Sequence, residues 1–161
     1  MAGRSTQPLD GMSDSSTTCV FCDIVAGREE ADFVFRDSLV CAFMDIQPVN
    51  PGHLLVVPIA HAPYLADLDT NVGAHMFRVG HRLANAIRCS GVRCEGINLF
   101  LADGVAAGQE ISHVHLHVFP RYDGDGFGLR HPPEYFSLPE RKALQSVADL
   151  VRRALGEAHA V

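Results

Sequence analysis

The chain has 161 residues, of which 47% are hydrophobic and 20% are charged, a composition typical of an ordinary globular protein. Its formal net charge is −6 and it has no run of Lys or Arg, which argues against nucleic acids and membrane surfaces as partners. No apolar stretch approaches the roughly 20 residues that span a bilayer, and the N-terminus lacks a signal-peptide pattern, so we expect a cytoplasmic protein.

Residues 1–17 are rich in Ser, Thr, Gly and Asp, and we expect a disordered tail there, ahead of one domain over residues 18–158. Apolar residues at helical spacing predict a long helix, and a second such pattern after a capping box at residues 137–140 predicts a C-terminal helix. We therefore predict an α+β fold with an antiparallel sheet of about five strands, one long central helix and a C-terminal helix. The expected strands cover 33–36, 39–44, 53–58, 97–102 and 113–119, and the expected long helix covers 67–89.

Five cysteines are an odd number, and in a chain that is not secreted they are more often free thiols or metal ligands than disulfides. Cys41 and Cys89 have apolar neighbours and are interpreted as small buried residues. Cys19 and Cys22 differ, because the Cys-x-x-Cys spacing is that of half a zinc site.

The segment 113–119 reads His-Val-His-Leu-His-Val-Phe, with histidines and apolar residues in alternation. In a strand this places the three imidazoles on one face and the apolar residues toward a core. Three interpretations are open: structural histidines, three ligands of one metal ion, or catalysis in which one imidazole is the nucleophile and another transfers protons.

The loop before these histidines, at residues 103–109, is rich in Gly and Ala and ends in Gln109. Backbone of this kind approaches a phosphate closely and directs N–H groups toward it, and the Gln109 amide adds a side-chain donor. A phosphate-binding loop beside imidazoles favours phosphoryl or nucleotidyl chemistry over a bare metal cluster.

The segment 113–119 resembles the His-φ-His-φ-His-φ-φ motif of the histidine triad superfamily, in which φ is apolar. The resemblance covers residues 19–122 and includes Cys19 and Cys22, residues 45–53, residues 107–109, and Pro120–Arg121. It implies the fold of that family and the activity of a nucleotide hydrolase or nucleotidyl transferase. The expected substrate is an adenine nucleotide derivative, either a dinucleoside polyphosphate or a nucleoside phosphoramidate.

The resemblance also implies a role for individual residues. His115 would attack the α-phosphorus and form a covalent nucleotidyl intermediate, His117 would contact the phosphate and move protons, and His113 would support the triad. Gln109 would position the phosphate beside Gly108, and His53 would buttress the triad from a neighbouring strand. Asp45 would accept hydrogen bonds from the ribose hydroxyls. The expected base-binding residues are Phe21, Ile24, Phe43 and Ile46, for which plain core packing is the alternative.

Relatives of this family that carry the cysteine pair suggest a structural zinc site made of Cys19, Cys22, His61 and His113. Two thiolates and two imidazoles form a closed tetrahedral set. We expect zinc, no organic cofactor, and a homodimer that forms through the long helix and an adjoining strand.

Two departures from the family pattern bear on the substrate. Glu110 stands where the phosphoramidase branch carries Ser or Thr, and Ala102 stands where that branch carries Asn. Asp45, in contrast, is typical of the phosphoramidase branch. Two alternatives to a hydrolase with a histidine nucleophile stay open: a nucleotide-binding sensor with little turnover, and a metal-dependent hydrolase that uses the triad as ligands.

Overall fold

The computed structural model describes residues 19–158, so the tail predicted at residues 1–17 lies outside the described residues. The chain divides into two compact units, the first ending at Asp125 and the second beginning at Gly126. The single domain expected over residues 18–158 therefore stays a prediction. None of the described helices is long and apolar enough to cross a membrane.

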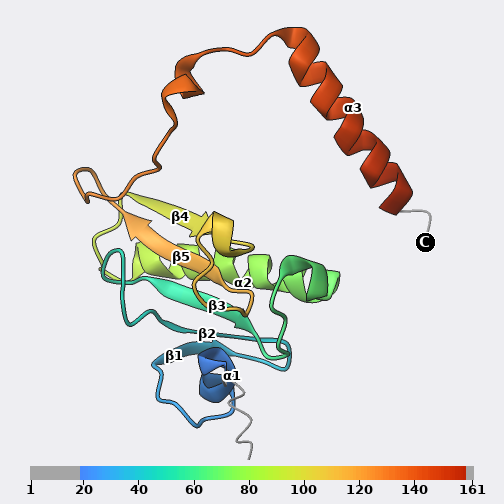
Figure 1. The fold of residues 1–161 in the computed structure, drawn as a ribbon. Helices are drawn as coiled ribbons and strands as arrows, with labels where there is room; N and C mark the ends of the chain where they lie inside the picture. Colours follow the sequence, from blue (N-terminus) through green and yellow to red (C-terminus); the bar gives the residue numbers. More distant parts are fainter. Residues whose placement is uncertain (1–18, 159–161) are drawn as a thin grey trace, which may run out of the picture. The chain divides into compact units, whose positions relative to one another are not determined.

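The first unit contains a five-stranded antiparallel sheet in the order β1-β2-β3-β5-β4 (Figure 1). The predicted fold class is confirmed, with the strands, the long helix α2 and the C-terminal helix α3 in the expected order. The elements of the first unit are α1 (Val20–Val25), β1 (Phe33–Arg36), β2 (Val40–Met44), β3 (Leu54–Pro58), η1 (Leu65–Asp67), α2 (Thr70–Cys89), β4 (Gly96–Phe100), η2 (Val105–Ala107) and β5 (Leu116–Arg121).

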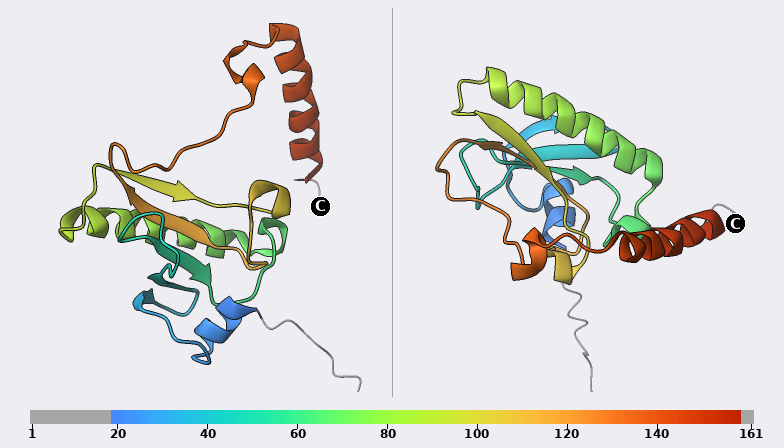
Figure 2. Two further views of the ribbon diagram at one scale, coloured as in Figure 1. Left: turned by 60° about the vertical axis from the view of Figure 1, so that its left-hand side comes forward. Right: turned by 90° about the horizontal axis from the view of Figure 1, so that it is seen from above.

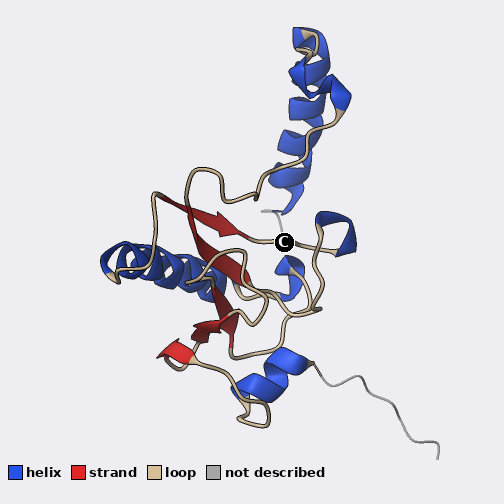
Figure 3. Ribbon diagram, turned by 90° about the vertical axis from the view of Figure 1, so that its left-hand side faces the viewer, coloured by secondary structure: helices blue, strands red, loops and turns tan. Residues whose placement is uncertain are grey.

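The sheet separates two apolar clusters, because successive strand residues point to opposite faces. Helix α2 covers one face, and α1 lies on the other (Figure 2, Figure 3). Val114, Leu116 and Val118 pack in the cluster under α2, as the alternation predicts. The residues of α2 in that cluster are Met76, Val79, Leu83, Ala84 and Ile87. Helix α1 and the histidines therefore lie on the face of the sheet opposite α2.

Helix α1 is an element that the sequence patterns do not predict. It has six residues, and its apolar side chains Phe21 and Ile24 are buried against Phe43 and Leu55 of the sheet. A helix this short is not stable by itself in water, so tertiary packing holds it. The Cys-x-x-Cys pair therefore lies at the start of a helix that is docked on the sheet.

The predicted strand 113–119 is displaced in the structure, since β5 begins at Leu116 and ends at Arg121. The backbone before it bonds elsewhere: the Val114 N–H donates to the carbonyl of Ala62, and the His113 N–H donates to the carbonyl of Ile111. Strand β3 ends at Pro58, which has no N–H to extend the ladder. His113 and His115 thus lie in a bend before the strand, and His117 lies within it.

The second unit contains the short helix η3 (Pro133–Phe136) and α3 (Arg141–Ala158). The capping box expected at residues 137–140 is wrong, because α3 begins at Arg141 and the Glu140 carbonyl accepts from the N–H groups of Ala143 and Leu144. The apolar positions that predicted α3 are exposed: Leu144, Val147, Leu150, Val151 and Leu155.

Gly80 of α2 packs unusually closely against the sheet, which yields a test of the fold. A β-carbon there would lie 2.9 Å from Leu116 Cδ2 and 3.3 Å from Leu99 Cδ2, whereas one at Gly73 would lie 3.4 Å from Leu68 Cδ2. We expect Gly73→Ala to stabilise the protein by about 0.5–1 kcal/mol through helix propensity. Gly80→Ala should destabilise the protein by about 1 kcal/mol, because the cost of crowding in the core outweighs the gain in helix propensity.

The two changes are compared by urea unfolding, as shifts of the midpoint at an unchanged slope. Equal stabilisation by both substitutions would contradict the close packing of α2 on β5.

Candidate functional site

Four histidines form a row on the sheet face opposite α2. The ring centroids of His115 and His117 are 4.8 Å apart, and those of His53 and His117 are 5.1 Å apart. Phe21 of α1 contacts both His113 and His115 edge-on, with centroids 5.9 and 5.2 Å away. The fold therefore brings together His53, at the start of β3, and the three histidines around the start of β5.

Hydrogen bonds fix the tautomers of His53 and His117. The Val49 N–H donates to His53 Nδ1 over 3.1 Å, so that nitrogen carries no proton. Burial lowers the pKa of His53, so the ring is neutral at pH 7 and its proton is on Nε2. His53 Nε2 lies 2.9 Å from His117 Nδ1 and donates to it. Neutral His117 consequently carries its own proton on Nε2.

His115 has the opposite tautomer. Its Nδ1 lies 2.7 Å from the carbonyl oxygen of His113, which can only accept, so the proton is on Nδ1 and the lone pair is on Nε2. No buried side-chain nitrogen among the described residues lacks a hydrogen-bond partner, so this bare Nε2 reaches solvent. A bare nitrogen on His115 thus stands beside the N–H of His117, the pair that a nucleophile and a donor require.

Asp45 lies beside these rings at the end of β2. One carboxylate oxygen accepts from the Gln47 N–H at 2.8 Å, and the other lies 3.4 Å from His53 Nδ1 and 3.9 Å from His117 Nδ1. Its side chain is 15% exposed, so the carboxylate is reachable from the histidine face. Asp45, His53 and His117 form one of two groups of potential metal ligands in the described part of the chain.

The second such group is formed by Cys19, Cys22, His61 and His113. His113 Nδ1 lies 3.3 Å from Cys19 Sγ, 3.7 Å from Cys22 Sγ and 3.2 Å from His61 Nδ1. His61 Nδ1 in turn lies 3.4 Å from Cys22 Sγ. The four side chains come from the start of α1, the segment after β3 and the bend before β5, and they meet around one point.

These distances fit a tetrahedral zinc site. Bonds of about 2.05 Å to nitrogen and about 2.3 Å to sulfur place two nitrogen ligands about 3.3 Å apart, and a nitrogen and a sulfur about 3.5 Å apart. The other nitrogen of His113, Nε2, donates to the Pro58 carbonyl over 3.1 Å, and burial lowers the pKa of His113 to about 4. The lone pair of Nδ1 is thereby directed at the thiols, as in a zinc ligand with an oriented ring.

One alternative from the sequence is not supported by this arrangement. His113 belongs to the cysteine group and His117 to the group with Asp45, and no group of potential ligands among the described residues contains all three triad histidines. The triad is therefore not one metal-binding set here.

A family model for the HIT domain matches residues 26–124. The chain belongs to the HIT family. A HIT family protein from Bacillus anthracis has a similar structure, with a TM-score of 0.78 and 34% identity over 85% of this chain and 96% of that chain. A zinc-bound histidine triad family protein from Mycobacterium smegmatis gives a TM-score of 0.67 and 36% identity, over 89% and 99% of the two chains. An adenylylsulfatase from Arabidopsis thaliana is 32% identical over 149 residues, which are 91% of this chain and 75% of that protein.

We expected the Gln109 side chain of this HIT protein to be free to donate hydrogen bonds to a phosphate, but in the structure it is not. Its Nε2 donates to the carbonyls of Pro63 and Ile111, at 2.8 and 3.0 Å, and its Oε1 accepts from the Gly104 N–H at 2.7 Å. Both amide protons are engaged within the loop, so Gln109 holds the loop in shape in this structure. Gly108, with φ of 89°, adopts the left-handed conformation that favours glycine.

The residues expected to bind the base divide into two environments. Phe21, Ile24 and Phe43 are buried in one cluster on the histidine face, which also fits the alternative of core packing. Ile46 is 93% exposed, in the loop that follows Asp45. Phe100 of β4 was not expected near the site, yet its ring lies 5.9 Å from that of His117 and it is partly exposed.

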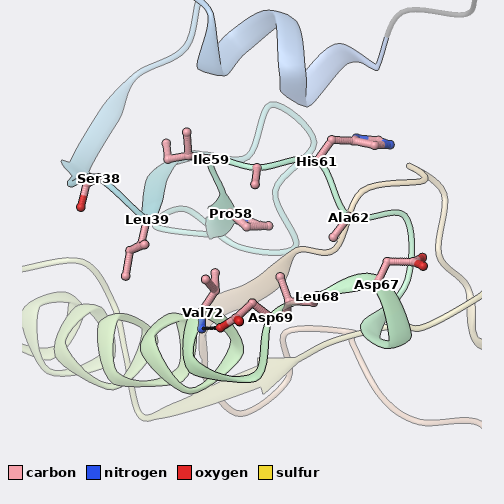
Figure 4. A pocket seen from close by; sticks show the side chains of 11 residues that line it. Ser38, Leu39, Pro58, Ile59, His61, Ala62, Asp67, Leu68, Asp69 and Val72 are labelled. Carbon is pink, nitrogen blue, oxygen red and sulfur yellow. Dashed lines mark hydrogen bonds between the residues drawn. The ribbon is translucent and has the colours of Figure 1, made fainter.

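A hollow of about 310 Å³ lies between the β1–β2 turn, the end of β3 and the start of α2, and none of the four histidines of the row lines it (Figure 4). Of the predicted site residues, only His61 lines it among the residues described. Its other lining residues include Leu39, Pro58, Leu68 and Val72, so it is mainly apolar. The predicted nucleotide site and this hollow are separate features.

The histidine row makes stability depend on pH. Burial, with the neighbouring His115 and His53, lowers the pKa of His117 from 6.5 to about 4. Between these two values the unfolded chain binds a proton that folded His117 does not, so the free energy of unfolding falls as the pH falls. The slope from His117 is at most about 1.4 kcal/mol per pH unit. We expect a shallower fall in His117→Gln, measured by urea unfolding from pH 7.5 to 4.5.

His81, exposed on α2, provides the matched control, since His81→Gln should leave the profile unchanged. Parallel profiles for the protein and His117→Gln would contradict a half-buried His117 that stays neutral over this pH range.

Proposed function

We propose that this HIT protein is a nucleotide hydrolase or nucleotidyl transferase that cleaves an adenine nucleotide derivative at the α-phosphate through a covalent nucleotidyl-His115 intermediate. The observation that carries the proposal is the pair of opposite tautomers, with a bare Nε2 on His115 and an N–H at Nε2 of His117, on rings 4.8 Å apart. The adenylylsulfatase relative supports nucleotide chemistry.

The first step joins His115 Nε2 to the α-phosphorus through its lone pair. The bond from phosphorus to the leaving group breaks, and the leaving group departs with the electron pair. The proton of His115 stays on Nδ1 and is donated in a hydrogen bond to the His113 carbonyl, which stabilises the cationic imidazole that results. In the second step water attacks phosphorus, a proton is released to solvent, and neutral His115 departs with the electrons of the P–N bond.

His117 favours a particular kind of leaving group. It is neutral and would become an anion if it gave up its Nε2 proton, so it acts best as a hydrogen-bond donor to an oxygen on which charge develops. A sulfate or phosphate departs as a stable anion and needs no full proton transfer, unlike an amine. Glu110, in place of the phosphoramidase hydroxyl, points in the same direction. We therefore favour a phosphate–sulfate or phosphate–phosphate anhydride as the substrate bond.

The rest of the site would bind the nucleotide. Asp45 would accept the ribose hydroxyls with the oxygen that faces the histidines, and Phe21 and Ile46 would border the base. Gly108 and the N–H groups of its loop would lie near the phosphate.

Zinc would occupy the Cys19, Cys22, His61 and His113 group. The donor set and its distances fit a closed structural site, and the zinc-bound protein from Mycobacterium smegmatis supports zinc as the metal. When bound, the metal supplies rigidity, tying α1 and the segment after β3 to the bend that carries His115.

We also propose that the protein is a homodimer. Strand β4 forms an edge of the sheet, and Phe77 on the neighbouring helix α2 is 61% exposed. An unpaired strand edge and an exposed aromatic side chain are both features that a second copy of the chain would cover.

The nucleophile is tested with adenylyl sulfate as the probe. We expect rapid quenching of the reaction to yield protein heavier by one adenylyl group, stable in base, and His115→Asn to abolish both this adduct and turnover, because amide nitrogen has no nucleophilic lone pair. His81→Asn, an exposed histidine of α2, should keep both.

An adduct or turnover that survives in His115→Asn would refute this assignment. Nucleotide binding without any adduct in the unaltered protein would instead favour the sensor.

The metal is tested by elemental analysis and thermal unfolding. We expect about one zinc per chain, lost in Cys22→Ser and kept in Cys89→Ser. Cys89 is exposed at the end of α2, so the burial expected for it from the sequence is wrong, whereas Cys41 is buried as expected. Because a ligand present at a thousandfold excess over its Kd stabilises by about 4 kcal/mol, a chelator should lower the Tm of the protein and of Cys89→Ser. Cys22→Ser should not respond. Equal zinc content in the two variants would contradict the site.

A further inference from the structure

The loop between β2 and β3 is anchored by one buried side chain, Asn50. Asn50 is 4% exposed, and its Nδ2 donates to the Pro120 carbonyl and to a carboxylate oxygen of Asp125, both at 2.9 Å. Asp125 is itself buried and paired with Arg121. Both protons of one amide are thus fixed by acceptors about 70 residues away in the sequence.

The anchored backbone makes two bonds to His53. The His53 N–H donates to the Asn50 carbonyl over 3.1 Å, and the Val49 N–H donates to His53 Nδ1 over 3.1 Å. The second bond keeps the proton of His53 on Nε2, and through it the proton of His117 on Nε2. Neither Val49 nor Asn50 contacts His117 by a hydrogen bond, so they act through His53.

Asp45 supplies a competing partner for the same nitrogen. Its carboxylate oxygen lies 3.4 Å from His53 Nδ1 and would accept a proton from it. If the Val49 N–H were displaced, His53 would carry its proton on Nδ1, toward Asp45, and Nε2 would become an acceptor. His117 would then donate from Nδ1 and present a bare Nε2 to the leaving group. Two complete chains of hydrogen bonds are therefore available, and the position of one backbone N–H selects between them.

We infer that Asn50 is a positioning residue that sets the tautomers of His53 and His117 by holding the Val49 N–H against His53 Nδ1. The inference rests on the proposed function for its catalytic consequence, since a bare His117 Nε2 repels a leaving group that becomes negative. The tautomers themselves are a property of the free protein and do not depend on any substrate.

The experiment reads the tautomers directly, by NMR of protein labelled with ¹⁵N in its histidines. In the unaltered protein we expect the unprotonated nitrogen of both His53 and His117 to be Nδ1. In Asn50→Ala we expect His53, and with it His117, to populate the form protonated at Nδ1. Asn85→Ala, the same substitution at an exposed position of α2, should retain the original tautomers.

Turnover of adenylyl sulfate gives the second readout. Loss of one donor to developing charge should lower kcat of Asn50→Ala by about 100- to 1,000-fold, with little change in KM. The double variant Asn50→Ala/Asp45→Asn should recover the original tautomers, because the competing carboxylate is gone. If Asn50→Ala had only lost its fold, the second substitution would not restore the original tautomers.

Two results would overturn the inference. One is a protonated Nδ1 on His53 in the unaltered protein, a measurement that needs no variant to fold. The other is an unchanged set of tautomers in Asn50→Ala. If the proposed function fails, there is no turnover or adduct, yet the NMR result stands, so the two failures are distinguishable.

Discussion

The hydrogen bond from His113 Nε2 to the carbonyl of Pro58 is the interaction on which both sites depend. It joins the end of β3 to the bend before β5, beyond Val56 and Leu116, the last pair of the ladder between the two strands. It turns the Nδ1 of His113 toward the two thiols. The carbonyl of the same residue then fixes the proton of His115, so one residue orients the proposed metal site with its ring and the proposed nucleophile with its backbone.

The sheet and the long helix are predictable from sequence because their signals are local. Period-two runs such as residues 39–44 and the helical spacing around Val79 arise from the faces that must be buried. Helix α1 and the start of β5 are different, since tertiary contacts decide them. Six residues form α1 because Phe21 packs on the sheet, and the bend at His113 forms because its backbone bonds to residues that the sequence places far away.

The sequence predicts which residues form the candidate site better than it predicts their protonation and hydrogen bonding. The family resemblance indicates His113 with the three residues around it, and the pair His115 and His117, and the fold brings each group together. The protonated nitrogen of each ring is decided by partners such as Val49 and a backbone carbonyl, which no spacing rule reveals. Gln109 shows the same limit, because an amide can brace its own loop as readily as bind a phosphate.

The boundary between the two units coincides with an anchor of the site. Every side chain of the histidine row and of the cysteine group precedes Gly126, and Asp125, the last residue of the first unit, receives the amide of Asn50. The shortest chain that retains all of these hydrogen bonds therefore ends no earlier than Asp125. Removing Asp125 as well would take away one of the two acceptors of the Asn50 amide, so the end of the first unit bears on the β2–β3 loop although the two are far apart in the sequence.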